Sequence, residues 1–266
     1  MLWIVAALAI LATGLTRSLR DETRALALAR QRIQAQAQGE AAIALALQAL
    51  IAGRQPLAGL HQGEVAFDGI TIPVQLMPLS GLIDVSTAGQ PLLQRLLAVA
   101  GGMTPDAAAD LAQRLIQWRQ QRDARGVPNG LQAVQDLLRV PGFDWDLYAR
   151  LAPLLTVDAR GSGRVNPMAA PLDVLIVLAG GDTAAARRIA QARDAGEVGI
   201  DTTTLDASLI DNTPARRLRA TARVPMADGA TVLVTHDIDL DARSPDGAPW
   251  YIFDANTRIE PAATHP

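Results

Sequence analysis

The residues best placed to do chemistry are three aspartates near the carboxyl end of the chain. In the stretch HDIDLDA, Asp237, Asp239 and Asp241 alternate with one histidine and two aliphatic residues. Because successive side chains of a strand point to opposite faces, these three carboxylates would share one face. Such a row could hold a cation. A solvated outer strand face explains it without a ligand, and we favour that interpretation.

The rest of the sequence offers little catalytic chemistry. The chain has only three histidines, His61, His236 and His265, and it has no cysteine, which excludes thiol nucleophiles and thiolate metal sites. No Gly-x-Ser-x-Gly, His-Glu-x-x-His or phosphate-binding loop occurs. We therefore expect a protein that is not an enzyme, with no catalytic residue and no metal ligand.

Four large aromatic residues lie in the middle of the chain: Trp118, Phe143, Trp145 and Tyr148. Aromatic side chains in a helical region form a hydrophobic core more often than a box around a ligand. We therefore assign all four to the core of the helical region.

A nucleic-acid interface is the strongest alternative function. The stretch VLIVLAGGDTAAARRIAQAR resembles a helix-hairpin-helix module, whose hairpin amides hold a backbone phosphate, and a membrane-anchored module of this kind would be a DNA-uptake receptor. However, Asp182 follows the hairpin where the phosphate would lie, and Arg187 and Arg188 are the only nearby cations. The net charge is −3 and no lysine occurs. Because phosphate binding draws on a basic surface, we favour a structural role and expect no nucleic-acid partner.

The amino-terminal region is the uncharged apolar segment MLWIVAALAILATGL. A secretory signal, a membrane anchor and the beginning of an assembly helix can all have this character. A secretory signal requires a basic residue before the apolar core, and none is present. The segment also reaches only about 22 Å, less than the roughly 30 Å of a bilayer core. We expect that the true start lies upstream or that the helix packs among others.

Residues 16–52 continue this segment as a helix. They contain no proline and one glycine, Gly39, and strong helix formers fill most positions. Apolar residues at spacings of four and seven predict a stripe on one helical face, formed by Leu19, Leu26, Ile33, Ala37, Ala41 and Leu45. We predict a single helix of about 50 residues that ends near Gly53. A separate anchor joined to an ordinary surface helix is the alternative.

Two regions of alternating hydrophobicity predict antiparallel strands. GEVAFDGITIPVQLMP alternates on both sides of Asp68 and Gly69, which predicts a hairpin with its turn at this dipeptide. RRLRATARVPMADGATVLVTHDIDLDA alternates around a second turn at Asp228 and Gly229, and WYIFDA offers a final strand. The residues between the two regions have a helical pattern. This order predicts an α+β fold in which a helical insertion interrupts a β-containing head.

The helical region contains an internal repeat. Two stretches share a glycine, an aliphatic residue, an aspartate or asparagine and an alanine at matching offsets: Gly81, Ile83, Asp84 and Ala88 against Gly163, Val165, Asn166 and Ala170. In each copy a Pro-Leu pair then begins a helix, and a Gly-Gly break separates it from an alanine-rich second helix. We predict two helix-hairpin-helix-like units with structural motifs at these positions. Chance likeness in a chain rich in alanine and leucine is the alternative.

Together these stretches resemble the K-type minor pseudopilin of bacterial type II secretion systems, the GspK-like family. The likeness runs in order through LWIVAALAILATGL…RSLRDE, SGLIDVSTA…LLQRLL, LIQWR, LQAVQDLLRVPG…YARLAPLLTV and GRVNPMAAPLDVLIVLAG. It implies a long amino-terminal transmembrane helix and a pilin-like α/β head with a large all-α domain inserted into it. Residues 1–53 would form the membrane and assembly helix, 54–80 the first part of the head, 81–213 the inserted α-domain, and 214–266 the second part of the head and a tail.

The resemblance also implies a function and a location. Family members are single-pass proteins of the Gram-negative inner membrane, with the head in the periplasm at the tip of the pseudopilus. They lie beside I- and J-type minor pseudopilins, help to initiate assembly, and contact exported substrates or the outer-membrane channel. Contacts with membrane lipid and sister subunits would then be made by Leu2, Trp3, Ile4, Val5, Leu8, Ile10, Leu11 and Leu15.

Three details of the sequence bear on this resemblance. K-type members lack the glutamate that most pilin-like subunits carry near the mature amino terminus, and no carboxylate precedes Asp21 here. Members are made with a short basic leader, whereas this sequence begins within the apolar segment, which predicts an upstream start. Members hold calcium in the α-domain, but the segment after WR is short and offers only Asp123 nearby. Since calcium takes six to eight oxygen ligands, we expect no calcium site in this segment.

Overall fold

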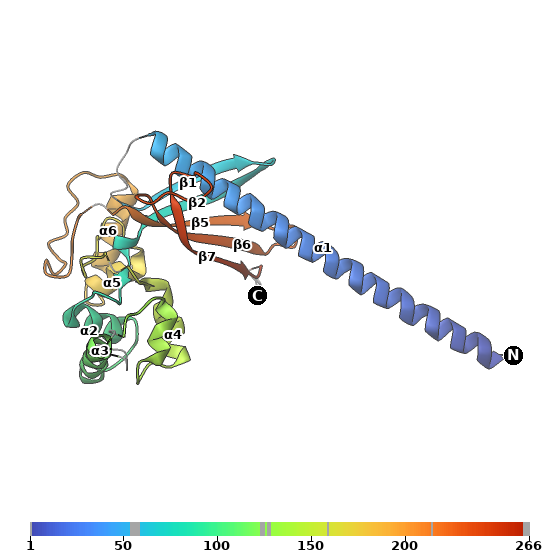
Figure 1. Ribbon diagram of the computed structural model, residues 1–266, viewed down its shortest axis with the longest axis horizontal. Coiled ribbons are helices and arrows are strands. Elements are labelled where there is room, and N and C mark those ends of the chain that lie inside the picture. The colour runs from blue at the N-terminus through green and yellow to red at the C-terminus, as the bar shows by residue number, and fades with distance from the viewer. Residues whose placement is uncertain are drawn as a thin grey trace.

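The computed structural model describes the backbone of residues 2–53, 59–122, 126, 129–158, 160–213 and 215–262; in the amino-terminal helix it describes the side chains of Glu22 and of residues 26–52. A single helix, α1 (Leu2–Ala52), forms the amino-terminal fifth of the chain. It projects far beyond the rest of the molecule, with the amino terminus at its free end (Figure 1). The predicted continuous helix and its end point are therefore confirmed.

The side chains predicted to make membrane and assembly contacts lie outside the described residues. They are those of Leu2, Trp3, Ile4, Val5, Leu8, Ile10, Leu11 and Leu15. Within the part of the chain that the structure describes, no helix has an apolar stretch long enough to cross a bilayer.

Five antiparallel strands form the sheet on which α1 packs (Figure 1). Their spatial order is β1 (His61–Phe67), β2 (Ile70–Pro78), β5 (Arg217–Pro225), β6 (Thr231–Asp239) and β7 (Tyr251–Glu260). The β1–β2 turn lies at Asp68 and Gly69, whose φ angles of 51° and 76° suit a tight hairpin. The predicted hairpins and final strand are confirmed, and the protein has a mixed α+β fold.

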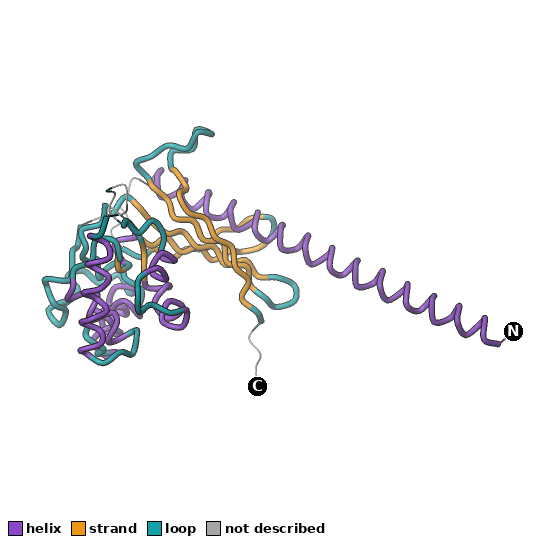
Figure 2. The backbone as a smooth tube through the Cα atoms, turned by 60° about the horizontal axis from the view of Figure 1, so that its bottom comes forward, coloured by secondary structure: helices purple, strands orange, loops and turns teal. Residues whose placement is uncertain are grey.

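The chain between β2 and β5 contains several short helices joined by loops and lies at one end of the sheet (Figure 2). Its helices are α2 (Gln90–Val99), α3 (Pro105–Gln120), α4 (Trp145–Leu151), α5 (Leu172–Leu178) and α6 (Thr183–Asp194). Short 3-10 turns lie at η1 (Leu79–Gly81), η2 (Val134–Arg139) and η3 (Ala152–Leu154). Two short strands, β3 (Ile83–Asp84) and β4 (Leu155–Thr156), pair in parallel.

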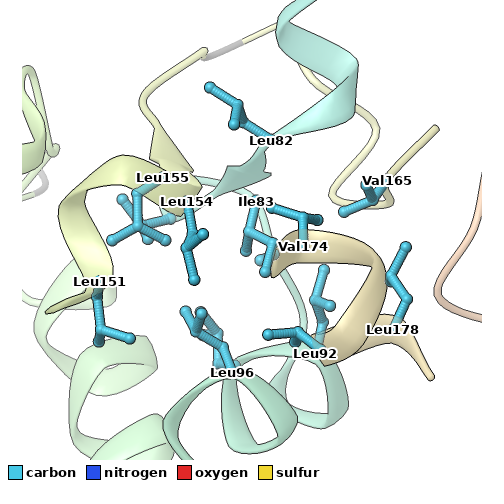
Figure 3. Packing of buried hydrophobic residues seen from close by; sticks show 14 of the residues in the cluster. Leu82, Ile83, Leu92, Leu96, Leu151, Leu154, Leu155, Val165, Val174 and Leu178 are labelled. Atoms are coloured by element: carbon cyan, nitrogen blue, oxygen red, sulfur yellow. The ribbon is translucent and has the colours of Figure 1, made fainter. Parts of the chain in front are cut away.

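The buried apolar side chains form two separate cores. One lies between α1 and the sheet and includes Ile43 and Val234. The other lies within the helical region, where Ile83, Leu96 and Val174 converge from different elements (Figure 3). Because apolar burial is the main favourable term in folding, each region has its own source of stability. The exact four-part division of the chain stays a prediction.

Candidate interaction surfaces and ion-paired sites

One side of α1 packs on the sheet through small and aliphatic residues. Ala35, Ile43 and Leu47 are at most 4% exposed. At Gly39 the helix comes very close to β6, because a Cβ at this position would lie 2.6 Å from Cγ2 of Val234. The absence of a side chain at Gly39 therefore sets how closely the helix can approach the strand.

Other apolar side chains of α1 remain exposed. Leu26, Leu28 and Ile33 are 62%, 40% and 70% exposed, and all three precede Ala35, which among the described side chains of α1 is the first to be buried. Of the predicted stripe, the structure leaves Leu26, Ile33, Ala37 and Leu45 exposed and Ala41 half-buried, and Leu19 lies outside the described side chains. The stripe is therefore not the face that packs on the sheet, and it is available for contacts with other chains.

The face of the sheet opposite α1 carries buried ion pairs between β5 and β6. Arg219 donates two hydrogen bonds to Asp237, from Nε to Oδ1 at 2.7 Å and from Nη2 to Oδ2 at 2.8 Å. Arg217 donates from Nε to Oδ2 of Asp239 at 3.1 Å. The side chains of Asp237 and Asp239 are only 7% and 3% exposed. The prediction of a solvated row is therefore wrong for these two aspartates, because arginines of the neighbouring strand pair with them.

The sequence contains a signal for these pairs that composition and motif searches miss. Arg217 and Arg219 alternate on one strand of a hairpin in the same way as Asp237 and Asp239 alternate on the other. The register places Arg217 opposite Asp239 and Arg219 opposite Asp237. Two alternating rows of opposite charge on the two strands of one hairpin therefore indicate cross-strand ion pairs.

Arg217 also links the sheet to the loop that follows β4. Its Nη1 donates to Oδ1 of Asp158 at 2.8 Å, and Nη2 of Arg160 lies 3.1 Å from Oδ2 of Asp239. Burial acts to raise the pKa of Asp239, but the backbone N–H of Asp241 and the Arg217 guanidinium hold that pKa below its ordinary value. Both loop and strand charges are thus satisfied within one network.

A cleft of about 260 Å³ opens beside this network, between the helical region and the sheet. Its lining carries four aspartates and four arginines, so the cleft favours neither an anion nor a cation. Arg216 and Asp241 pair across its rim at 2.8 Å, with both side chains at least half exposed. Among the described residues, no cluster of three or more histidine or acidic side chains could hold a metal ion, and Asp123 lies outside them.

His236 lies on the α1 side of β6 and is 8% exposed. Burial lowers its pKa below the ordinary value of 6.5, although the negative charges of Glu40 on α1, Asp237 and Asp254 act to raise it. The contact between α1 and the sheet therefore contains an imidazole that stays neutral to a lower pH than a free histidine.

The free energy of unfolding is expected to fall as the pH drops below about 6.5, because the unfolded chain takes up a proton that the folded chain resists at His236. The loss should level off below the folded-state pKa. Urea unfolding at pH values of about 7.5 and 5.5 measures the difference, and His236→Phe should abolish this part of it. An identical pH dependence in the wild type and the variant would contradict the assignment.

The two repeat motifs of the helical region contact each other reciprocally. A Cβ at Gly163 would lie 2.7 Å from the carbonyl oxygen of Thr87, and a Cβ at Gly81 would clash with the carbonyl oxygen of Ala169. Thr87 and Ala169 occupy equivalent positions in the two copies, as the two glycines do. The copies are therefore related by an approximate two-fold arrangement that needs glycine at both positions.

Asp84 and Asn166 form equivalent turns in this pair. Oδ1 of Asp84 accepts a hydrogen bond from the backbone N–H of Ser86, and Oδ1 of Asn166 accepts one from Met168, each at 2.9 Å. The remaining motif residues are fully buried: Ile83, Ala88, Val165 and Ala170. The structure thus brings the eight motif positions together inside the helical region.

The backbone N–H groups of the hairpin between α5 and α6 already bind a carboxylate of the same chain. Oδ1 of Asp182 accepts hydrogen bonds from the backbone N–H groups of Ala184 and Ala185, both at 3.0 Å, and so caps α6. A phosphate at these amides would have to displace the carboxylate. Arg187 and Arg188 are exposed. This geometry favours a structural role for the hairpin.

Of the four middle aromatic residues, two pack against the helical core, whereas Trp145 is mainly in solvent. Trp118 and Phe143 pack against the helical core. Trp145 is 70% exposed and meets Tyr148 edge-on, with ring centroids 5.7 Å apart. The prediction of a core position is wrong for Trp145, because α4 is a short helix that directs Leu147 inward instead.

Comparisons with known proteins bear on the fold. No family model and no curated protein matches the sequence. The structure is similar to a chain in the crystal structure of the GspK–GspI–GspJ complex from the type 2 secretion system of enterotoxigenic Escherichia coli. The TM-score is 0.55 at 14% identity, and the likeness covers 89% of this chain and 99% of that chain. The protein therefore shares its fold with a component of a type II secretion pseudopilin complex.

Proposed function

We propose that this protein is a structural minor pseudopilin of the K type, at the tip of a type II secretion pseudopilus. The fold likeness extends over nearly the whole chain, and the sequence stretches that resemble the K-type family occur in the same order. The observation that carries the proposal is the exposed apolar face of α1 at Leu26 and Ile33, which lie seven residues apart on the same side of the helix. A subunit that packs among other helices buries such a surface.

On this proposal the molecule acts through surfaces and not through catalysis. The helix α1 packs beside I- and J-type minor pseudopilins, and residues 81–213 form an inserted α-domain that the head presents outward. The protein is anchored in the inner membrane with its head in the periplasm, helps to initiate assembly, and contacts exported substrates or the outer-membrane channel.

Ile33→Asp is expected to weaken association with the I- and J-type partners at least about tenfold, because burying one aliphatic side chain contributes about 1.5–3 kcal/mol and a buried charge adds a penalty. Co-expression of the full chains followed by affinity purification measures the retained partners. Gln34→Asp, at the next exposed position of α1, is the control for added charge. Neither variant should change the urea unfolding midpoint of the protein in the absence of its partners, because both positions are exposed.

Two results would count against this function. The first is that the wild-type chain forms no complex with the I- or J-type partner when the three are mixed, which would contradict a role in assembly. The second is that it binds duplex DNA in a salt-sensitive manner at physiological ionic strength, which would favour the DNA-receptor alternative despite the occupied hairpin.

A further inference from the structure

β7 is a long edge strand that contains neither lysine nor proline. Nine of its ten residues are exposed, and among the described residues it pairs with β6 alone. Natural edges are blunted by lysine, proline or short length, and β7 has neither of these residues. Tyr251, Ile252, Phe253 and Ile259 are each more than a third exposed. The other edge strand, β1, is shorter and contacts α1.

We infer that β7 is a self-association surface, on which β7 of a second copy pairs antiparallel with Asn256 on the two-fold axis. A two-fold axis normal to a sheet keeps every side chain on its own face. Since successive residues alternate in face, each permitted register places one residue opposite itself. The charged residues of β7, which are Asp254, Arg258 and Glu260, then decide between these registers.

Charge complementarity selects the register centred on Asn256. In it, Asp254 of each copy lies opposite Arg258 of the other, so the favourable pair occurs twice. If the axis passes through Asp254 or Arg258, that residue lies opposite the same residue of the second copy, and the two like charges repel. If the axis passes through residue 257, Asp254 lies opposite Glu260 of the second copy, again with like charges. With the axis at residue 253 or 255, no charged residue of one copy lies opposite a charged residue of the other. Among registers that pair at least half of the strand, only the Asn256 register therefore joins opposite charges.

The local geometry of β7 suits this pairing. Asp254 and Arg258 share a face of the sheet, because they lie opposite Asp237 and Leu233 of β6 in one uninterrupted register. The β-bulge is opposite the step from Asp237 to Ile238, just before Asp254, so the central segment is regular. The Arg258 side chain is 65% exposed and donates from Nη2 to Oε1 of Glu260 on the same strand at 3.2 Å, so pairing with Asp254 of a second copy would exchange or share this exposed contact.

This pair is distinct from a filament contact and goes beyond the proposed function. The axis leaves both copies of α1 on the same side of the extended sheet but running in opposite directions. Subunits of a filament are related by one screw operation along its axis and so run in the same direction, whereas the two-fold axis reverses α1, so the β7 pair is a form of the protein outside the filament.

A cysteine placed on the axis tests the register directly, because the natural chain contains no cysteine. Directly opposed residues of antiparallel strands have Cα atoms about 4.5–5.5 Å apart, within the range of a disulfide. The full-length Asn256→Cys protein is expected to form a covalent dimer under mild oxidation. Gln62→Cys, at an exposed position on β1, is the matched control and should stay monomeric. Equal cross-linking of both variants, or of neither, would overturn the proposal.

Charge exchange provides the second test. Arg258→Asp or Asp254→Arg turns two opposite-charge pairs into two like-charge pairs and should weaken dimerisation about tenfold in analytical ultracentrifugation. The double variant D254R/R258D restores both pairs and should restore the dimer. A wild-type chain that is monomeric at high concentration, or single variants that dimerise like the wild type, would refute it. If Ile33→Asp abolishes the dimer and the β7 variants do not, self-association takes place through α1 and not through β7.

Discussion

Asp237→Ala is expected to lower the free energy of unfolding by about 3–5 kcal/mol, because it removes one partner of a buried ion pair and leaves the other charge uncompensated. Arg219 holds Asp237 through two short hydrogen bonds, and its own side chain is 21% exposed. Burial acts to lower the pKa of Arg219, but its hydrogen bonds to Asp237 raise it above its ordinary value. Urea unfolding of the wild type and the variant measures the difference.

The protein contains a matched control for this change. Arg216 and Asp241 form a pair of similar length at 2.8 Å, but their side chains are 67% and 50% exposed. Asp241→Ala should therefore cost less than about 1 kcal/mol. Replacing both members of the buried pair, as in R219M/D237L, should recover most of the loss, since no charge is left unpaired. If Asp237→Ala costs no more than Asp241→Ala, the buried pair is not a source of stability.

Gly39→Leu is expected to lower the free energy of unfolding by about 1–3 kcal/mol and to loosen α1 from the sheet. The new side chain would occupy space now filled by Val234, whose methyl group would lie 2.6 Å from the first added carbon. Urea unfolding measures the loss, and limited proteolysis of α1 measures the loosening. Because glycine is a poor helix former, the same substitution on an exposed helix face would be stabilising.

Ala37→Leu supplies the comparison for this second prediction. Ala37 lies on the same helix two residues away and is exposed, so the larger side chain meets solvent. Its effect should stay within about 0.5 kcal/mol. Equal effects at residues 37 and 39 would show that the close approach of α1 to β6 does not limit the helix position.

The helices, strands and turns of this protein could be predicted from the sequence, because each depends on residues that are close together in the chain. Continuous helix formers without proline predict α1, and the dipeptides at Asp68 and Asp228 predict the two hairpin turns. The repeat around Gly81 and Gly163 is also visible in the sequence, since each copy contains the same small residues at the same offsets. Each of these signals depends on backbone conformations within a few residues of one another.

Only the tertiary structure decided which surfaces are covered. Periodicity identifies an apolar stripe on α1, but it does not say which side meets the sheet, and Ile33 proved to be exposed while Ala35 is buried. In the same way, alternation places Asp237 and Asp239 on one face, but their burial depends on arginines that lie about 20 residues away along the chain. Burial is a property of two surfaces that meet, and a single segment specifies only one of them.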